Sequence, residues 1–275
     1  MEKIEYEINS KIQIGFGLKE LWENRELLYF FTWRDIKVKY KQTVLGILWA
    51  ILQPIILMLT FTLFFNHSLG VKSGSVPYPV FVFSGLIIWN IFSNGVGNAG
   101  NSMVSNAGII KKIYFPRLII PISSILVALF DFLLAFLVEL ALLFYYHVSF
   151  SPVSLILSIS LSLIITLLSG FGLGCLLASL NVKYRDFRYI IPFLLQIWLF
   201  ATPVLYPISF IHNKYISALL SLNPMVGASQ LSRSFMDGSP IINLQVGISL
   251  LAALVLFLGG LFYFRKTEAY FADIA

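Results

Sequence analysis

Residues 44–65 have the sequence VLGILWAILQPIILMLTFTLFF, which is the first long apolar stretch of the chain and contains no charged residue. At 1.5 Å per residue this stretch would form a helix about 33 Å long. A helix of that length can cross the hydrocarbon core of a bilayer, which is about 30 Å thick. The stretch therefore predicts a transmembrane helix.

Further apolar stretches follow and indicate a polytopic membrane protein. We place them at residues 79–97, 118–146, 153–180, 189–206 and 241–264. Hydrophobic residues make up 58% of the chain, charged residues 12%, and the mean hydropathy is +0.86, which is outside the usual range of soluble domains. Because a helix satisfies its own backbone hydrogen bonds in lipid, the predicted fold is an all-α membrane protein with six transmembrane helices.

The positions of the basic residues predict the orientation of these spans. With six spans, every Lys and Arg except Lys72, Lys214 and Arg233 falls on the side that holds both termini. Basic residues in short loops mark the cytoplasmic side of a membrane protein. We therefore expect a multi-pass protein of the cytoplasmic (inner) membrane with both termini in the cytoplasm.

The spans divide the chain into a cytoplasmic N-terminus (1–43), a transmembrane domain (44–264) and a cytoplasmic tail (265–275). No cleavable signal peptide is expected, because residues 1–43 lack an apolar run long enough for one. Between Leu18 and Lys41, apolar and aromatic residues recur mostly every three or four positions, which predicts an amphipathic helix that lies in the membrane interface. The alternative is a basic segment that merely anchors the chain.

The segments between the spans are too short to hold an independent catalytic domain. The longest are residues 1–43 and 207–240, and the chain has no G-x-x-x-x-G-K-[ST] motif that would bind a nucleotide. Its one cysteine, Cys175, excludes an intramolecular disulfide and a Cys-rich metal site. We expect that the chain is not an enzyme and holds no cofactor or metal; any ATP that it uses is hydrolysed by another chain.

Several short motifs carry a resemblance to a known family. They are WRDIKVKYKQTVLG at 33–46 continuing to Gln53-Pro54, IKKIYFPR at 110–117, YRD at 184–186, IIP at 190–192, Thr202-Pro203, and NPM at 223–225. In this order they resemble the permeases of polysaccharide-exporting ABC transporters, which serve O-antigen, capsule and teichoic acid export. The resemblance covers nearly the whole chain, and its specificity comes from the collinear order of the motifs.

The resemblance implies a homodimer of this chain with two copies of a separate ABC ATPase, which binds ATP and Mg²⁺. This assembly would export a polyprenyl-diphosphate-linked polysaccharide, with O-antigen expected first and teichoic acid or capsular polysaccharide as alternatives. No nucleic-acid partner is expected. A membrane-embedded polyprenyl-phosphate enzyme is the rival from another class, but the acidic residues of the chain are scattered. An ion-coupled carrier is expected to show inverted repeats, and no convincing repeat is present.

The resemblance assigns the link between the second and third spans to docking of the ATPase. Residues 101–117 are small and polar at first and then basic, which suits a short surface helix that ends at Pro116. The predicted coupling residues are Asn106, Ile110, Lys111 and Lys112, joined by Arg185 and Asp186 from the second link. Without the family, an ordinary loop with anchoring lysines is the alternative.

Two sets of side chains are predicted to contact the substrate. Cations at the inner surface are suited to bind the lipid diphosphate; they are Arg34, Lys37, Lys39 and Arg188. Aromatic faces pack against the C–H faces of sugars, and the family places its first and fifth spans around the conduit. The predicted rings are Trp49, Phe61, Phe193, Trp198, Phe200 and Tyr206. For each ring alone, contact with lipid or with the core is the alternative.

Two acidic residues, Asp131 and Glu139, lie in the third predicted span. They are about 80° apart around the helix and about 12 Å apart along it, so they do not touch each other. Charges in a membrane indicate a wet cavity or a translocation path; the alternative is that each acid is hydrogen-bonded or protonated within the bundle, or lies near an end of this long helix. Residues 207–240 are half apolar and interrupted by polar residues, which predicts a re-entrant helical hairpin. Pro203, near the end of the fifth predicted span, is a candidate gate because proline breaks the helix there.

Overall fold

A computed structural model of the protein describes residues 18–41, 43–68, 70–71, 73–74, 76–211, 213–268 and 271. Within these ranges the chain is helical and contains no β-strand. The predictions made for residues 1–17 and 272–275, for Lys72 and for the side chain of Lys214 lie outside the described residues.

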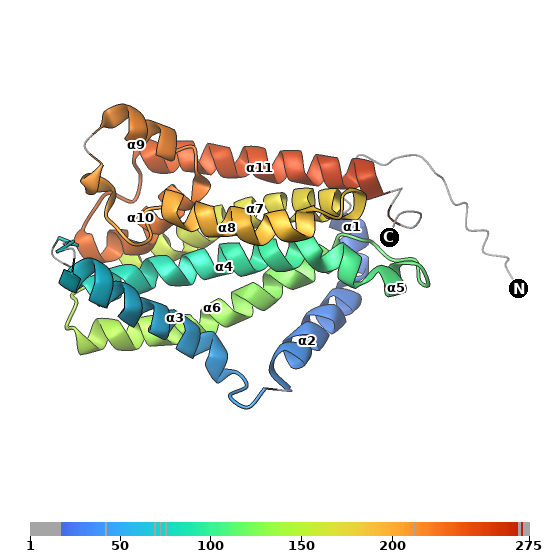
Figure 1. Cartoon of the computed structure of the whole chain (residues 1–275), viewed down its shortest axis with the longest axis horizontal. Coiled ribbons are helices and arrows are strands. Elements are labelled where there is room, and N and C mark those ends of the chain that lie inside the picture. Colours follow the sequence, from blue (N-terminus) through green and yellow to red (C-terminus); the bar gives the residue numbers. More distant parts are fainter. Residues whose placement is uncertain are drawn as a thin grey trace, which may run out of the picture.

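The helices are short near the N-terminus and long in the rest of the chain (Figure 1). In chain order they are α1 (Leu18–Glu23), α2 (Arg25–Lys41), α3 (Leu48–Phe61), the π-helix η1 (Thr62–Ser68), α4 (Tyr78–Ser105), α5 (Ala107–Ile110), α6 (Ile119–Tyr145), α7 (Pro152–Lys183), α8 (Phe187–Ala201), the 3₁₀ helix η2 (Ile208–Phe210), α9 (Lys214–Leu220), α10 (Pro224–Asp237) and α11 (Leu244–Glu268).

Five helices of the described chain are long and apolar enough to cross a membrane: α3 with η1, α4, α6, α7 and α11. The predicted span 189–206 is shorter than expected, because α8 has 15 residues and ends at Ala201. Thr202 is extended, with φ −107° and ψ 135°, since the ring of Pro203 disfavours helical backbone in the preceding residue. A sixth crossing made by α8 stays a prediction.

Two predicted helix boundaries in the N-terminal half of the chain are wrong. The single helix expected from Leu18 to Lys41 is divided into α1 and α2 at Asn24, whose Nδ2 donates to Glu20 O over 2.8 Å. Such a local bond competes with the regular helical pattern. The surface helix expected to end at Pro116 is the short α5, because α4 runs on through residues 101–105 of the predicted link.

Helix α4 lies at the centre of the bundle, where it packs against α3, α6, α7, α8 and α10 (Figure 1). In its most apolar window 78% of the residues are buried, against 11% for the span formed by α3 and η1. Helix α3 thus leaves most of its apolar surface uncovered by the rest of the chain.

Helices α7 and α11 approach each other at two glycines. A Cβ on Gly172 would overlap the backbone of Leu256, and a Cβ on Gly260 would overlap the backbone of Gly172. Small residues let helices in a membrane pack with their backbones in close approach. The neighbouring Gly259 has nothing within 4 Å of its Cβ position, so it plays no such part.

The two ends of the bundle differ. We call the end that carries α1, α5, the turn at 184–186 and the C-terminal end of α11 the basic end; the opposite end carries η2 and α9 and is called the hairpin end (Figure 1). Helices α9 and α10 occupy the predicted re-entrant segment, and α10 packs against α4, α7 and α11. Whether this segment enters the bilayer stays a prediction.

Candidate functional site

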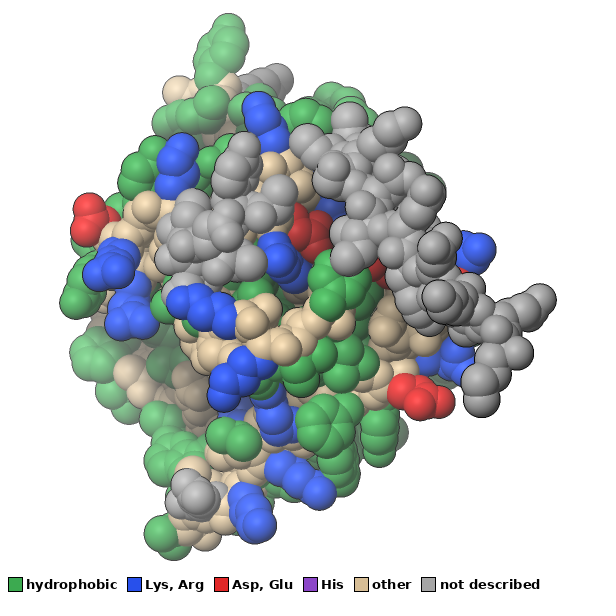
Figure 2. Space-filling model, turned by 90° about the vertical axis from the view of Figure 1, so that its right-hand side faces the viewer, with side chains coloured by type: hydrophobic (Ala, Val, Ile, Leu, Met, Phe, Trp, Pro, Cys, Tyr) green, Lys and Arg blue, Asp and Glu red, His purple; other side chains and the backbone are tan. Residues whose placement is uncertain are grey.

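Lys and Arg side chains gather at the basic end, where few Asp or Glu side chains are seen (Figure 2). The links and helix ends that form this end contribute Lys111, Lys112, Arg117, Lys183, Arg185, Arg188, Arg265 and Lys266. A surface with this excess of one sign attracts anions, whether lipid headgroups or acidic partners.

The link between α4 and α6 presents an exposed tip on a buried base. Lys111 and Lys112 are exposed, and so is Tyr114, whose side chain is 89% accessible. Ile110 is buried against Phe31 of α2 and Phe115. Of the predicted coupling residues in this link, the two lysines therefore lie on the surface, whereas Ile110 fixes the link to the bundle.

A hydrogen bond joins this link to α2. Arg34 Nη2 donates to Asn106 Oδ1 over 2.9 Å, and Asn106 Nδ2 donates to Ser102 O over 2.9 Å. Arg34 also pairs with Asp35 at 2.8 Å, and its guanidinium lies 4.6 Å from the centre of the Phe31 ring. The structure thus brings together two residues that the sequence placed in different sets, and Arg34 is partly occupied within the chain.

The other side of the link is joined to the end of α11. The backbone N–H of Arg117 donates to Glu268 Oε1 over 3.3 Å, and Arg117 Nη1 donates to the carbonyl of Glu268. Glu268 Oε2 also pairs with Arg265 at 2.8 Å. Sequence reasoning missed Glu268, because a single acid near the end of the chain carries no motif.

A cavity of about 420 Å³ opens at the basic end where α4, α7 and α8 meet. Arg185, Arg188 and Tyr189 line it, and Asn181 joins them from the end of α7. Asn181 Nδ2 donates to Gly100 O over 3.0 Å, which holds α7 to α4. Neither guanidinium group has a hydrogen-bond or ion-pair partner within the described ranges, so both are available for an anion. Arginine forks match phosphate oxygens in geometry and charge.

Two other predicted site residues, Asp186 and Lys37, do not line this cavity. Asp186 is exposed before α8, and its side chain makes no cap bond to that helix. Lys37 is exposed on α2, with its ammonium 5.3 Å from the centre of the Trp33 ring. The lining of the cavity therefore includes Arg185 and Arg188 but neither Lys37 nor Asp186.

Two side chains of α2 contact Asp131 of α6. Lys39 Nζ forms an ion pair with its carboxylate, and Tyr40 Oη donates to Asp131 Oδ1. Burial first, and then the hydrogen bond and the charge of Asp131, raises the pKa of Tyr40 above its ordinary value. The ammonium of Lys39 thus has a partner inside the chain, and its predicted contact with a lipid headgroup stays a prediction.

A small polar cavity of about 60 Å³ adjoins this pair, between α3, α4 and α6. Besides Asp131, its lining includes the amides of Gln53, Asn90 and Asn94 and the ring of Trp49. Sequence reasoning quoted Gln53 within a family motif but gave none of the three amides a role. The signal that could have found them is a polar side chain inside an apolar span, which is unusual and often functional.

The six predicted aromatic residues fall into two groups. Trp49, Phe193 and Phe200 are 48%, 64% and 58% exposed on α3 and α8. The other three are half-buried and have partners inside the chain: Phe61 packs against Phe65, Trp198 against Phe92, and Tyr206 Oη donates to Phe200 O over 3.2 Å. Within one chain, α3 and α8 both pack against α4.

Glu139 remains without a hydrogen bond. It is fully buried in α6, and both carboxylate oxygens lack a partner among the described residues. Within the same ranges, no group of three or more His, Cys, Asp or Glu side chains is placed to hold a metal ion.

Comparison with known proteins places these features in a family. Residues 26–236, from α2 to the end of α10, match the model of the ABC-2 type transporter family. The chain belongs to the ABC-2 type transporter family. The matched region contains both basic links, the cavity at Arg185 and Arg188, and the exposed faces of α3 and α8. Membership in this family, together with the five long apolar helices, makes the protein a multi-pass membrane protein.

Relatives of this ABC-2 transporter chain carry names from polysaccharide export. It is 34% identical to the O-antigen export system permease protein RfbA of Myxococcus xanthus over 76% of the chain and 79% of that relative. It is 30% identical to a protein of the same name from Klebsiella pneumoniae over 96% and 99% of the two chains. Identity to the polysialic acid transport protein KpsM of Escherichia coli is 27%, over 86% and 92%.

Proposed function

We propose that the protein is the transmembrane subunit of an ATP-driven exporter that moves a polyprenyl-diphosphate-linked polysaccharide, O-antigen in the first instance, across the cytoplasmic membrane. The names of the relatives in Myxococcus xanthus and Klebsiella pneumoniae support this substrate. The observation that carries the proposal is the cavity at the basic end, where the side chains of Arg185 and Arg188 have no hydrogen-bond or ion-pair partner within the described ranges. Two unpaired guanidinium groups at a membrane surface suit the diphosphate of a lipid carrier.

The proposed topology has six crossings, with α8 as the fifth. The basic end then lies in the cytoplasm, in agreement with the distribution of Lys and Arg, and the hairpin end lies outside. Helices α1 and α2 lie in the inner interface, where Trp22 and Tyr29, which are 72% and 68% exposed, suit the headgroup boundary. The segment with α9 and α10 forms the re-entrant hairpin on the outer side.

The transport path is proposed to lie between two copies of the chain. The helices α3 and α8 expose large apolar side chains that lipid or a second copy of the chain can cover. With two copies, Trp49, Phe193 and Phe200 lie on the surfaces that can line a shared conduit. Rings contact the C–H faces of sugars weakly and repeatedly, which suits a moving polymer.

A separate ATPase subunit is proposed to bind the exposed tip of the link, at Lys111, Lys112 and Tyr114. ATP and Mg²⁺ bind on that subunit and are hydrolysed there. Movement of the tip reaches the bundle through the bond of Asn106 to Arg34 and through the contacts of Arg117 with Glu268. The coupling residues therefore act as parts of one rigid connection.

The test is export by proteoliposomes that contain the chain, its ATPase and a lipid-linked O-antigen. Changing both cavity arginines, Arg185→Gln with Arg188→Gln, is expected to raise the substrate concentration needed for half-maximal export at least tenfold. Assembly with the ATPase is expected to survive, because this proposal places the ATPase at Lys111, Lys112 and Tyr114 and assigns Arg185, first predicted as a coupling residue, to the substrate. Lys183→Gln is the matched control, since Lys183 is an exposed cation beside the cavity and does not line it. Unchanged export in the double variant, or export by the chain without an ATPase, contradicts the proposal.

Capsular polysaccharide is the second candidate, because KpsM of Escherichia coli, which is named for polysialic acid transport, aligns with most of the chain. Teichoic acid is the third candidate, because its precursors are also lipid-linked polymers. Parallel proteoliposomes with lipid-linked polysialic acid or teichoic acid precursors distinguish the three. Export of one of these, and not of O-antigen, would replace the substrate and leave the transport function in place.

A further inference from the structure

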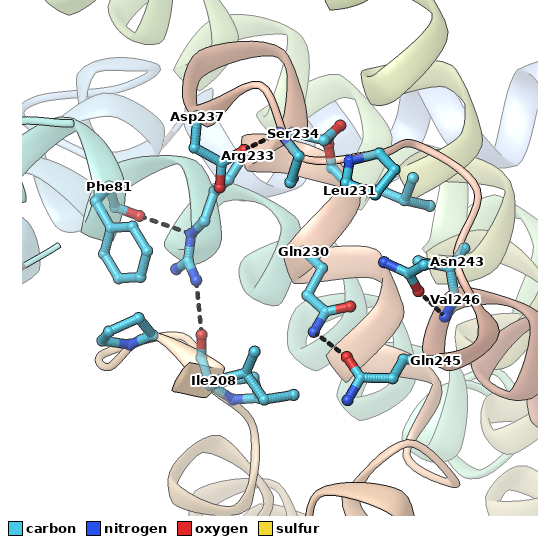
Figure 3. Close-up of a pocket in the computed structure, with 14 residues that line it drawn as sticks. Phe81, Ile208, Gln230, Leu231, Arg233, Ser234, Asp237, Asn243, Gln245 and Val246 are labelled. Atoms are coloured by element: carbon cyan, nitrogen blue, oxygen red, sulfur yellow. Dashed lines mark hydrogen bonds between the residues drawn. The ribbon is translucent and has the colours of Figure 1, made fainter. Parts of the chain in front are cut away.

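A buried arginine organises the hairpin end. Arg233 of α10 is 5% exposed, and each of its three guanidinium nitrogens donates to a backbone carbonyl. Nε donates to Phe81 O over 3.0 Å (Figure 3), and the two terminal nitrogens donate to Pro203 O over 2.7 Å and Val204 O over 2.6 Å. Gly85 leaves room for this group, since a Cβ there would overlap it. The guanidinium of Arg233 therefore holds three backbone segments together inside the chain.

A cavity of about 290 Å³ opens beside Arg233, between α10, the segment 203–208 and the start of α11. Its lining combines two kinds of surface (Figure 3). Gln230, Asn243 and Gln245 bring amide groups from α10 and from the start of α11, while the faces of Pro207 and Ile208 are apolar. We call it the outer cavity.

The amides of the outer cavity have hydrogen-bonding capacity left over. Gln230 Nε2 donates to Gln245 Oε1 over 2.9 Å, but the buried Gln230 Oε1 has no partner among the described residues. Asn243 Oδ1 accepts from the N–H of Val246 over 2.8 Å, and its Nδ2 makes no hydrogen bond within those ranges. A buried amide oxygen without a partner costs free energy. Asn243 Nδ2 is thus a free donor at the cavity, while Gln230 Oε1 is an acceptor without a partner that is buried in the cavity wall.

The charged group that is exposed at the outer cavity is acidic. Asp237 is exposed at the rim, whereas the cation among the lining residues, Arg233, is buried. Arg233 balances the formal charge of Asp237, but its three nitrogens are bonded to carbonyls, so an incoming ligand meets the carboxylate first. An anionic ligand is therefore disfavoured, and a neutral ligand with several hydroxyl groups is favoured.

We propose that the outer cavity binds a neutral sugar residue of the glycan as it leaves the transporter, an inference that rests on the proposed export function. Amide side chains donate to and accept from sugar hydroxyls, and apolar faces cover the C–H side of the ring. A volume of about 290 Å³ is at the small end of ligand sites, which suits one or two sugar rings rather than a longer segment.

The test measures binding of two soluble probes to the complete permease–ATPase complex in lipid nanodiscs. The probes are a neutral mannose disaccharide and an anionic sialic acid disaccharide, titrated under the same conditions. Saturable binding of the neutral probe is expected, with at least tenfold weaker binding of the anionic one. Absence of saturable binding of the neutral probe to the unaltered complex overturns the inference.

Two variants locate the binding. Ser239→Trp fills the outer cavity and keeps the backbone N–H that donates to Asp237. This change is expected to weaken the binding of the neutral probe at least tenfold. Ser151→Trp is the control, an exposed serine before α7 that does not line the cavity. Asp237→Asn is expected to reduce the discrimination against the anionic probe several-fold. Equal affinity of Ser239→Trp and the unaltered complex, or unchanged discrimination by Asp237→Asn, contradicts the assignment.

Export by the same preparations separates the two proposals. Export of lipid-linked glycan without binding of the neutral probe refutes the outer cavity as a sugar site and leaves the transport function intact. Binding of the probe that Ser239→Trp abolishes, in a complex that exports no glycan, supports the sugar site and refutes the transport function.

Discussion

Arg34 Nη2 donates a 2.9 Å hydrogen bond to Asn106 Oδ1, although 72 positions separate the two residues in the chain. The bond connects α2 with the segment that begins the link to α6. One contact therefore joins the helix assigned to the membrane interface with the link assigned to the ATPase. In the proposed coupling, displacement of the link would be transmitted to α2 through this contact.

Loss of the contact between Arg34 and Asn106 is expected to weaken coupling. Arg34→Ala and Asn106→Ala should each lower export per ATP hydrolysed several-fold, and a double-mutant cycle should give an interaction energy of about 1 kcal/mol. Arg25→Ala is the control, since Arg25 is an exposed cation on the same helix. Strict additivity of the two changes would show that the bond carries no coupling.

Removal of the Tyr40 hydroxyl tests how α2 is held to α6. Tyr40→Phe keeps the buried ring but loses the hydrogen bond to the Asp131 carboxylate, and bonds to charged groups contribute about 1.5–3 kcal/mol. We expect a loss of this size in the free energy of unfolding, measured by denaturant titration in detergent. Tyr29→Phe is the control because Tyr29 is 68% exposed on the same helix. Equal stability of both variants contradicts the prediction.

The same residue predicts a dependence on pH. Because the pKa of Tyr40 is raised in the folded protein, the neutral hydroxyl stabilises the fold fully below the unfolded pKa of about 10. Above that pH the unfolded chain loses the proton first, so this contribution declines. The difference in unfolding free energy between the unaltered protein and Tyr40→Phe should therefore shrink as pH rises above about 10. A constant difference would argue against a buried, protonated Tyr40.

The close approach of α7 and α11 predicts a strong effect of one methyl group. Gly172→Ala places a Cβ against the backbone at Leu256, and overpacking of this kind costs about 1–3 kcal/mol. Gly259→Ala is the matched control, because nothing lies near its Cβ position, and alanine is favoured over glycine within a helix. Melting temperature in detergent should fall for the first variant and stay or rise for the second. Equal shifts would refute the packing argument.

Glu268 is predicted to couple the end of α11 to the link. Glu268→Ala removes the carboxylate that accepts from the N–H of Arg117 and pairs with Arg265. Export should fall several-fold at a given rate of ATP hydrolysis, while copurification of the ATPase is retained. Lys266→Ala controls for loss of a charged side chain on the same helical turn. A variant that exports normally would remove Glu268 from the coupling path.

The sequence predicted the apolar helices well, because hydropathy and length are local properties of a segment. The stretches at 79–97 and 153–180 lie within α4 and α7, and the family resemblance is confirmed by the match over residues 26–236. Boundaries were less accurate where one residue decides them. Pro203 shortens α8, and Asn24 divides the N-terminal helix.

The sequence by itself determined that the protein is a helical membrane protein of this transporter family with basic links, since each of these features can be read from neighbouring residues. The tertiary structure decided which charged and polar groups find partners. Lys39 pairs with Asp131, Arg233 is committed to three carbonyls, and Arg185 and Arg188 line a cavity. The physical reason is that hydrogen bonds, ion pairs and cavities form between residues far apart in the chain, where the packing of helices sets the distances.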